Sequence, residues 1–220
     1  MRSFSTVFTA LLLVGALAPG AHGTTRVAPA IGVFLDFEAQ PSPQTVKAME
    51  AEVASIMAPS GLIFSWQKLN GDQQEATFAD LVIIHFKGSC NAGFAPLSEL
   101  GPWTENGTAL ASTQVSNGQV LHFTDVNCNE VVHYLAAEAA HVKQAKRDEL
   151  YGRALGRIVS HEMYHIFAGT EKHASDGVAR AYFSRQQLIQ PVFAFEPKES
   201  EALRDFRIRA FMATEADPEP

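Results

Sequence analysis

The sequence predicts a single α+β domain in which a mixed, twisted β-sheet packs on helices. Two observations favour this class. Short β-prone apolar runs alternate with an amphipathic helical pattern in the first half of the chain, and a hairpin followed by helical segments occupies the second half. The chain has 220 residues, a length that suits one domain with a proper core better than two. No internal repeat, low-complexity tract or Pro/Ser linker divides it.

The first half of the chain reads as strand, helix, strand, strand. Residues 30–37 (AIGVFLDF) are apolar and β-prone, which predicts the first strand. A helix starts at residues 41–43 and ends at Ser60-Gly61, because apolar side chains recur between them at helical spacing: Val46, Met49, Val53, Ile56 and Met57. Residues 62–66 alternate apolar and polar side chains, and residues 81–86 (LVIIHF) form an apolar run that suits a central strand covered on both faces.

The second half begins with a loop and a hairpin. Residues 88–107 are rich in Gly, Pro, Ser and Asn, which is typical of a long surface loop. Residues 109–115 and 119–126 then read as two short strands. Between these strands, Asn117-Gly118 supplies the positive φ angles that a tight hairpin turn requires.

Three helices are expected after the hairpin. Residues 130–146 favour helix by composition, and residues 148–168 form a second helix for which Gly169 is the expected C-terminal stop. A third helix follows Pro197. Its apolar side carries Leu203, Phe206, Ile208 and Phe211.

The N-terminus has the pattern of a secretory signal peptide. Arg2 gives a positive start, residues 7–17 are almost unbrokenly apolar, and residues 21–23 (AHG) have small side chains at the two positions that a signal peptidase reads. We therefore expect residues 1–23 to be removed and residues 24–220 to form the mature domain. The apolar run is too short to cross a hydrocarbon core of about 30 Å. Secretion to an extracellular or periplasmic compartment is expected, with no integral membrane segment after cleavage.

Cys90 and Cys128 are the two cysteines of the chain. In an oxidising compartment an even pair without CxxC spacing is typically bridged. We therefore expect a structural disulfide, which chain-entropy reasoning values at about 3 to 4 kcal/mol for a loop of this length. The alternative is that Cys90 is a metal ligand or a latency thiol.

The charge of the chain narrows the class of partner. Asp and Glu number 24 against 17 Lys and Arg, which gives a formal net charge of −7. A nucleic-acid partner requires a clustered basic surface, which this sequence does not indicate.

Residues 158–173 (IVSHEMYHIFAGTEKH) carry the pattern that points to chemistry. His161, Glu162 and His165 form HExxH. On a helix the two histidines lie one turn apart and about 40° apart around the axis, so both imidazoles can bind one metal ion. Glu162 lies one step further round, where it can reach a metal-bound water without taking a coordination position.

The rest of this helix predicts which way the pair faces. One arc is apolar and expected to be buried, and it carries Leu155, Ile158, Val159, Met163 and Ile166. The opposite arc is expected to face solvent, and it carries Arg153, Arg157, Ser160 and Tyr164. The two histidines lie at the margin of the buried arc, where a metal site can open on a cleft.

His173 is the expected third ligand, because a catalytic zinc ion takes three protein ligands and leaves a fourth position to water. Gly169 permits the chain to turn back toward the helix. Two alternatives remain open at this point. One is Asp176, and the other is a helical glutamate further along, Glu196 or Glu199.

The segment resembles the metzincin zinc peptidases, whose pattern is HExxHxxGxxH followed by a methionine turn. The match comprises His161, Glu162, His165, Gly169 and His173, in the variant HExxHxxxGTxxH. The glycine comes one residue late, the last histidine comes two residues late, and no methionine follows at the expected distance. Val178 or Ala179 would occupy the place of that methionine beneath the metal. The resemblance implies a zincin fold, with a mixed sheet packed on the HExxH helix, and Zn²⁺ as cofactor.

The resemblance also implies a secreted zinc metalloendopeptidase. Zn²⁺ would lower the pKa of a bound water and polarise the scissile carbonyl, while Glu162 would act as general base and then pass the proton to the leaving amine. Tyr182 is the expected partner for negative charge on the substrate, since Tyr164 falls on the solvated arc. An extended peptide or protein substrate would pair with residues 109–115 if that strand edges the sheet.

Two other functions remain open. One is a catalytically inactive zinc-binding relative that acts as a secreted binding or interaction domain, which the missing methionine favours. The other is a domain in which HExxH holds no metal. The remaining histidines of the mature chain are assigned no role, and they are His85, His122, His133 and His141.

Overall fold

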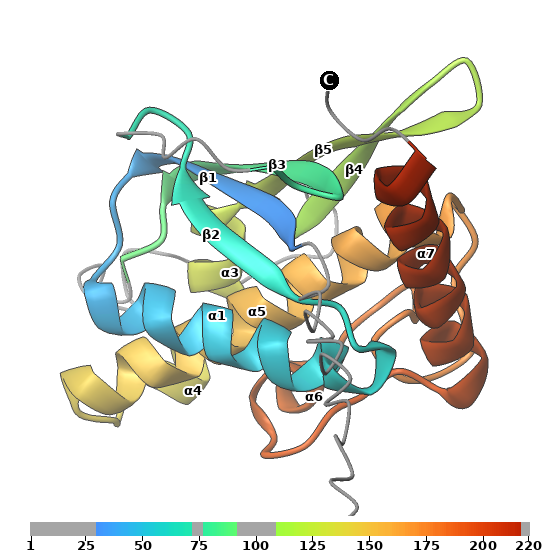
Figure 1. The fold of residues 1–220 in the computed structure, drawn as a ribbon. Coiled ribbons are helices and arrows are strands. Elements are labelled where there is room, and N and C mark those ends of the chain that lie inside the picture. Colours follow the sequence, from blue (N-terminus) through green and yellow to red (C-terminus); the bar gives the residue numbers. More distant parts are fainter. Residues whose placement is uncertain (1–29, 72–76, 92–108, 217–220) are drawn as a thin grey trace, which may run out of the picture.

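The computed structural model describes residues 30–71, 77–91 and 109–216, and Figure 1 shows their fold. The expected signal peptide, residues 1–23, lies outside the described residues. So does most of the expected surface loop, residues 88–107.

Five strands form one mixed sheet in the order β2-β1-β3-β5-β4. Their bounds are Ile31–Ala39 (β1), Phe64–Lys68 (β2), Asp80–Ser89 (β3), Ala111–Ser116 (β4) and Gln119–Asn127 (β5). Strand β1 pairs in parallel with β2 and β3, and β3 pairs in parallel with β5. Strand β4 pairs antiparallel with β5 and forms one edge of the sheet. The predicted α+β class and the mixed sheet are therefore confirmed.

The helices pack on one face of this sheet (Figure 1). Their bounds are Pro43–Met57 (α1), the 3₁₀ turn Ala58–Ser60 (η1), Cys128–Tyr134 (α3), Ala136–Ala139 (α4), Gln144–Ala168 (α5), Arg185–Ile189 (α6) and Pro197–Ala216 (α7). Helices α1 and α5 lie side by side beneath the strands. Helix α1 begins where predicted, because Ser42 caps it by accepting a hydrogen bond from the Thr45 amide at 3.1 Å.

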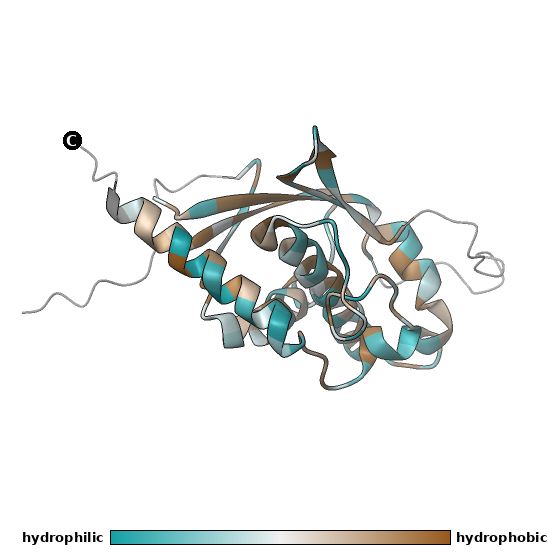
Figure 2. Cartoon of the chain, turned by 90° about the vertical axis from the view of Figure 1, so that its right-hand side faces the viewer, coloured by the Kyte–Doolittle hydropathy of each residue, from teal (hydrophilic) through white to brown (hydrophobic). Residues whose placement is uncertain are grey.

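The core lies between the sheet and α1 and α5. Alternate strand residues such as Val33, Val82 and Val126 point toward the helices and are fully buried. The predicted apolar arc of α5 is buried against them. Figure 2 shows the same arrangement as apolar colour along the strands and the central helix. This packing fixes α5, and with it the HExxH pattern, under the middle of the sheet.

Most of the arc of α5 that was expected to face solvent is buried as well, and only Arg153 is half-buried, so that prediction is wrong. Arg157 and Ser160 are fully buried, and Tyr164 is buried against the ring of Phe195, with centroids 5.6 Å apart. The reason is that α6, α7 and the segment between them cover this side of the helix. Helix α5 is therefore a central helix rather than an amphipathic surface helix.

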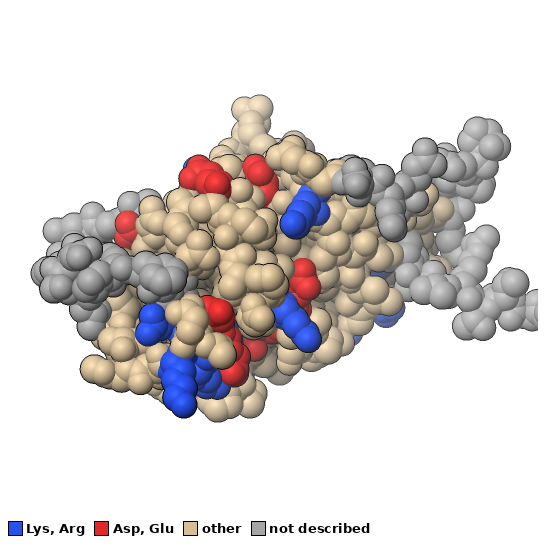
Figure 3. Space-filling view, turned by 90° about the vertical axis from the view of Figure 1, so that its left-hand side faces the viewer, with Lys and Arg blue, Asp and Glu red and all other residues tan. Residues whose placement is uncertain are grey.

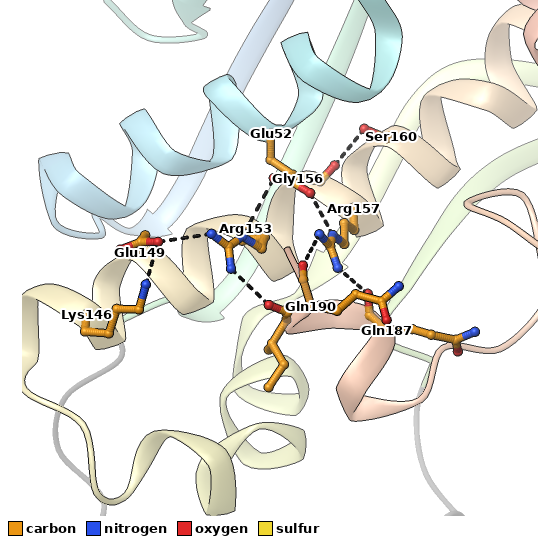
Figure 4. A network of polar contacts seen from close by, with 10 residues as sticks. Glu52, Lys146, Glu149, Arg153, Gly156, Arg157, Ser160, Gln187 and Gln190 are labelled. Carbon is orange, nitrogen blue, oxygen red and sulfur yellow. Dashed lines mark hydrogen bonds and ion pairs between the residues drawn. The ribbon is translucent and has the colours of Figure 1, made fainter. Parts of the chain in front are cut away.

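The buried Arg157 is satisfied by partners on two other elements (Figure 4). Its Nε donates to Glu52 on α1 at 2.7 Å. Its two terminal nitrogens donate to the backbone carbonyls of Gln187 and Gln190. This guanidinium therefore joins α1, α5 and the end of α6.

The single helix expected over residues 130–146 is wrong too. The chain forms α3 and α4 there, and α5 begins at Gln144. Leu135 leaves the helical conformation with φ −98° and ψ 4°, and its side chain is fully buried. The Tyr134 hydroxyl donates to the Phe183 carbonyl at 2.9 Å. Tertiary contacts therefore set the direction of this segment, which its helix-favouring composition does not reveal.

Cys90 and Cys128 form the predicted disulfide, with Cα atoms 4.7 Å apart. It joins the residue after β3 to the first residue of α3. Both cysteines are buried.

Two surface properties bear on the class of partner. Among the described helices, none combines the length and the hydropathy that a membrane span requires. On the face drawn in Figure 3, Lys and Arg side chains lie among Asp and Glu, and no continuous basic surface forms on that face.

Candidate metal centre

Helix α5 brings His161 and His165 together as their spacing predicts. Their Nε2 atoms lie 3.0 Å apart, and both side chains are buried. The two rings meet nearly at right angles, with centroids 4.7 Å apart. The two nitrogens therefore converge on one point at the surface of the helix.

Backbone carbonyls fix the orientation of both rings. The Nδ1–H of His161 donates to the Val178 carbonyl at 2.8 Å, and the Nδ1–H of His165 donates to the Thr170 carbonyl at 2.7 Å. A carbonyl can only accept, so each ring carries its proton on Nδ1 and presents a lone pair on Nε2. Two facing lone pairs at 3.0 Å repel each other unless a cation lies between them. Such carbonyl partners are typical of histidines that bind a metal.

Gly169 ends α5 and lets the chain reverse. It has a left-handed φ of 58°, and the Thr170 amide donates to the His165 carbonyl at 3.1 Å. The returning segment carries His173 to the pair. Its ring stacks on the His161 ring with centroids 5.2 Å apart, and its centroid lies 4.8 Å from that of the His165 ring.

The three imidazoles form a group that could hold a metal ion. One ligand nitrogen from each of His161, His165 and His173 lies within 4.8 Å of the other two. Within the described residues, these three histidines are the group whose ligand atoms lie close enough together to hold one metal ion. Two members are buried and His173 is exposed, so the group opens to solvent on one side.

The alternative third ligands do not join this group. The Asp176 carboxylate accepts a hydrogen bond from the Gly177 amide at 2.8 Å and pairs with Arg180 at 3.6 Å. Glu199 is buried on α7. Burial raises the pKa of Tyr164, and the charge of Glu199 adds to that increase. The geometry therefore brings His173, rather than an acidic side chain, to the histidine pair.

Val178 and Ala179 occupy a tight loop against His161. Both are fully buried. The Ala174 amide donates to the Ala179 carbonyl at 2.8 Å, and the Val178 amide donates to the Ala194 carbonyl at 3.0 Å. This loop supplies the carbonyl that holds the His161 ring, so its backbone, more than its side chains, supports the cluster.

Glu162 lies beside the histidines and is nearly fully buried. Its Oε2 accepts a hydrogen bond from the Thr113 hydroxyl on β4 at 2.6 Å. Burial raises the pKa of Glu162 to about 7, although the Thr113 hydrogen bonds oppose the shift. Burial also lowers the pKa of His161 to about 4 and lowers that of His165. Both imidazoles are therefore neutral near pH 7, which is the form that binds metals.

The cluster lies in a cleft of about 880 Å³. The edge strand β4 forms one wall, and the segment between α5 and α6 forms the other. Tyr134, Ile158 and Phe183 give the cleft an apolar part beside the histidines. Tyr182 also lines the cleft and is 83% exposed. Tyr164 is not among the lining residues, and its ring packs against Phe195.

Sequence reasoning identified the three histidines and Glu162 but missed their supports. Thr113, the Thr170 carbonyl and the Val178 carbonyl each contact a site residue. A local signal existed for Thr170, since it follows the Gly169 turn directly. The other two come from distant segments, and no spacing pattern marks them.

Two histidines with no assigned role contact carboxylates outside this cluster. His85 pairs with Asp36 at 2.8 Å, and His122 pairs with Asp80 at 2.9 Å. Neither belongs to the metal group.

The chain was compared with protein-family models, curated proteins and solved structures, and none of them matches it. The residues of the cleft themselves therefore carry the functional argument.

Proposed function

We propose that this protein is a secreted, zinc-dependent metallopeptidase of metzincin-like fold. One observation carries the proposal. Carbonyl acceptors hold the Nδ1 protons of His161 and His165, so that two Nε2 lone pairs face each other at 3.0 Å beside a third imidazole. Three imidazoles with one open side are a donor set that suits catalytic zinc.

The position of Glu162 supports hydrolysis rather than simple metal storage. Zinc in such a site supplies Lewis-acid chemistry, polarising a carbonyl and lowering the pKa of a water. Glu162 lies next in sequence to a ligand, and its buried carboxylate lines the same cleft as the three histidines. A carboxylate at this position can take a proton from water and return it to the leaving amine. Tyr182, at the exposed side of the cleft, is the proposed donor to negative charge on the substrate carbonyl oxygen.

The edge strand supports a peptide as substrate. Among the strands that the structure describes, β4 has no partner on its outer side, and it lines the cleft. An extended peptide can pair with such an edge through backbone hydrogen bonds, which would lay it across the histidines. A peptidic hydroxamate soaked into crystals is expected to lie along β4 with its hydroxamate at the three imidazoles.

The metzincin-like fold and secretion are parts of the same proposal. A mixed sheet with an antiparallel edge strand above a central HExxH helix supports the first. The N-terminal pattern of residues 1–23 and the Cys90–Cys128 disulfide support the second.

The decisive test combines metal analysis with turnover. The purified protein is expected to contain one zinc per chain and to cleave an unfolded protein substrate. Activity should disappear with a chelator and return with zinc. Glu162→Gln is expected to keep its zinc and lose activity by about 10²- to 10⁴-fold, because the general base is gone.

Matched variants show whether His173 or Asp176 is the third ligand, and the wild type distinguishes the proposed enzyme from the alternative functions. His173→Ala should lose zinc, whereas Asp176→Ala and the exposed-histidine control His141→Ala should keep it. Stoichiometric zinc without turnover in the wild type would instead identify an inactive zinc-binding domain. A wild type that binds no divalent metal would refute the proposal altogether.

A further inference from the structure

The strongest polar contact of Glu162 comes from the edge strand. The Thr113 Oγ1 atom lies 2.6 Å from Glu162 Oε2 and 3.4 Å from the Glu162 carbonyl oxygen. A hydroxyl has one proton, and the shorter contact shows where it goes. A distance of 2.6 Å is typical of an O–H group that donates to a carboxylate, which is among the stronger hydrogen bonds in proteins.

The local structure of β4 aims Thr113 at the helix. Thr113 pairs in register with Thr124 of β5, and both face the helical side of the sheet. The register shifts between Thr113 and Val115, which marks a bulge directly after Thr113. Bulges of this kind redirect side chains and are frequent beside active sites.

The backbone of Ser112, the residue before Thr113, is also held by a hydrogen bond. The Thr124 hydroxyl donates to the Ser112 carbonyl at 3.1 Å. The strand backbone is thus held on both sides of the side chain that reaches Glu162. Little freedom remains for Thr113 to swing away.

We propose that Thr113 is a positioning residue for Glu162, and this inference rests on the metallopeptidase function proposed above. The terminal torsion of a glutamate is broad and roughly two-fold, so burial alone does not distinguish its two oxygens. The Thr113 hydroxyl engages Oε2 and leaves Oε1 to exchange the proton with water and with the leaving amine. The edge strand that would bind the peptide therefore also orients the base that acts on it.

Three variants test this role by comparing the change in kcat with the change in KM. Thr113→Val keeps the strand backbone and the volume of the side chain but removes the hydroxyl. Its kcat is expected to fall about 10- to 100-fold, as a misplaced catalytic group would cause, with KM changed less than about twofold. Thr113→Ser restores the hydroxyl and is expected to stay within about threefold of the wild type.

Gln114→Met is the control on the same strand. It removes an exposed amide that donates to Asp125 at 2.9 Å rather than to Glu162. It should leave kcat near the wild-type value. Equal losses in Thr113→Val and Gln114→Met, or a Thr113→Ser variant as slow as Thr113→Val, would overturn the proposal.

A structural measurement keeps this test independent of turnover. Crystal structures of the zinc-loaded wild type and of Thr113→Val should show Glu162 in one orientation in the first and turned or divided between two orientations in the second. The cobalt-substituted proteins should give the same visible spectrum, because the histidines are unchanged. A wild-type crystal with Thr113 Oγ1 beyond 3.5 Å of both carboxylate oxygens would refute the positioning role. If the carboxylate turns as expected but the wild type cleaves no peptide, the proposed function fails and the positioning role stands.

Discussion

Arg157 is a cation without exposed surface on the helix that carries HExxH. Its partners are the Glu52 carboxylate and the carbonyls of Gln187 and Gln190. Replacement by Met would leave the mostly buried Glu52 carboxylate with only the more distant Arg153, 3.8 Å away, and would leave two carbonyls without their donor. Breaking a buried pair in this way costs about 3 to 5 kcal/mol. We therefore expect Arg157→Met to lower the free energy of unfolding by that amount, as measured by denaturant titration.

Lys146→Met is the control for this prediction, because Lys146 pairs with Glu149 on the same helix at an exposed position (Figure 4). An exposed pair contributes about 0 to 1 kcal/mol. The double variant Glu52→Gln with Arg157→Met should recover part of the loss, since the mostly buried carboxylate is then removed as well. Arg153 then keeps its pair with Glu149. Equal stability of Arg157→Met and Lys146→Met would contradict the assigned role.

Residues of the site divide into those with a local sequence signal and those without one. His161, Glu162 and His165 were predictable because helical periodicity alone places them. Thr113 was not, because its contact with Glu162 depends on the register of β4 and on the bulge that follows. The wrong prediction that Arg157 faces solvent has a related cause. A helical wheel treats the charged side of a helix as its solvent side, but here partners from α1 and α6 bury that charge.

Helices α1 and α5 approach each other so closely that glycine is required at two positions. A Cβ atom on Gly156 would lie 2.6 Å from the Glu52 Cβ and 2.8 Å from the Met49 carbonyl oxygen. On Gly152 it would lie 2.5 Å from the Ala48 Cβ. These two glycines, one helical turn apart, were the sign in the sequence that a second helix packs on α5.

We predict that Gly156→Ala destabilises the protein. Helix propensity alone favours alanine by about 1 kcal/mol, so a surface glycine would show a gain. Here the added methyl group meets backbone and must push α1 away, and overpacking of this kind typically costs about 1 to 3 kcal/mol. Thermal unfolding of the variant decides between the two signs, and an increase in Tm would refute the close packing.

The existence of the elements was easier to predict than their arrangement. The hairpin turn at Asn117-Gly118 was predictable, because both residues have the positive φ that the turn requires. The strand order was not, because β1 lies between β2 and β3 although it precedes both in the chain. The break at Leu135 also depends on tertiary contacts rather than on local composition.

At the scale of the whole molecule, the proposed metal links two parts of the chain that otherwise meet through hydrogen bonds and apolar packing. Two ligands belong to the central helix α5, and His173 belongs to the segment that runs on toward α6. The sequence predicted this convergence because Gly169 permits the reversal, but it could not predict the carbonyls that hold the rings. Binding at such a junction should stabilise the native state as a whole rather than one loop.

Metal removal is therefore expected to lower Tm markedly. A ligand present at about 1,000 times its Kd and bound by the native state alone adds about 4 kcal/mol to the free energy of unfolding. For a domain of this size, 1 kcal/mol corresponds to about 2 to 4 °C in Tm, so saturating zinc should raise Tm by about 8 to 16 °C over the chelated protein. His173→Ala should lose most of this rise, whereas His141→Ala should keep it, because only the first histidine belongs to the cluster. A zinc-dependent rise of the same size in His173→Ala would mean that the ion binds elsewhere, and the convergence of the three imidazoles would then have no bearing on stability.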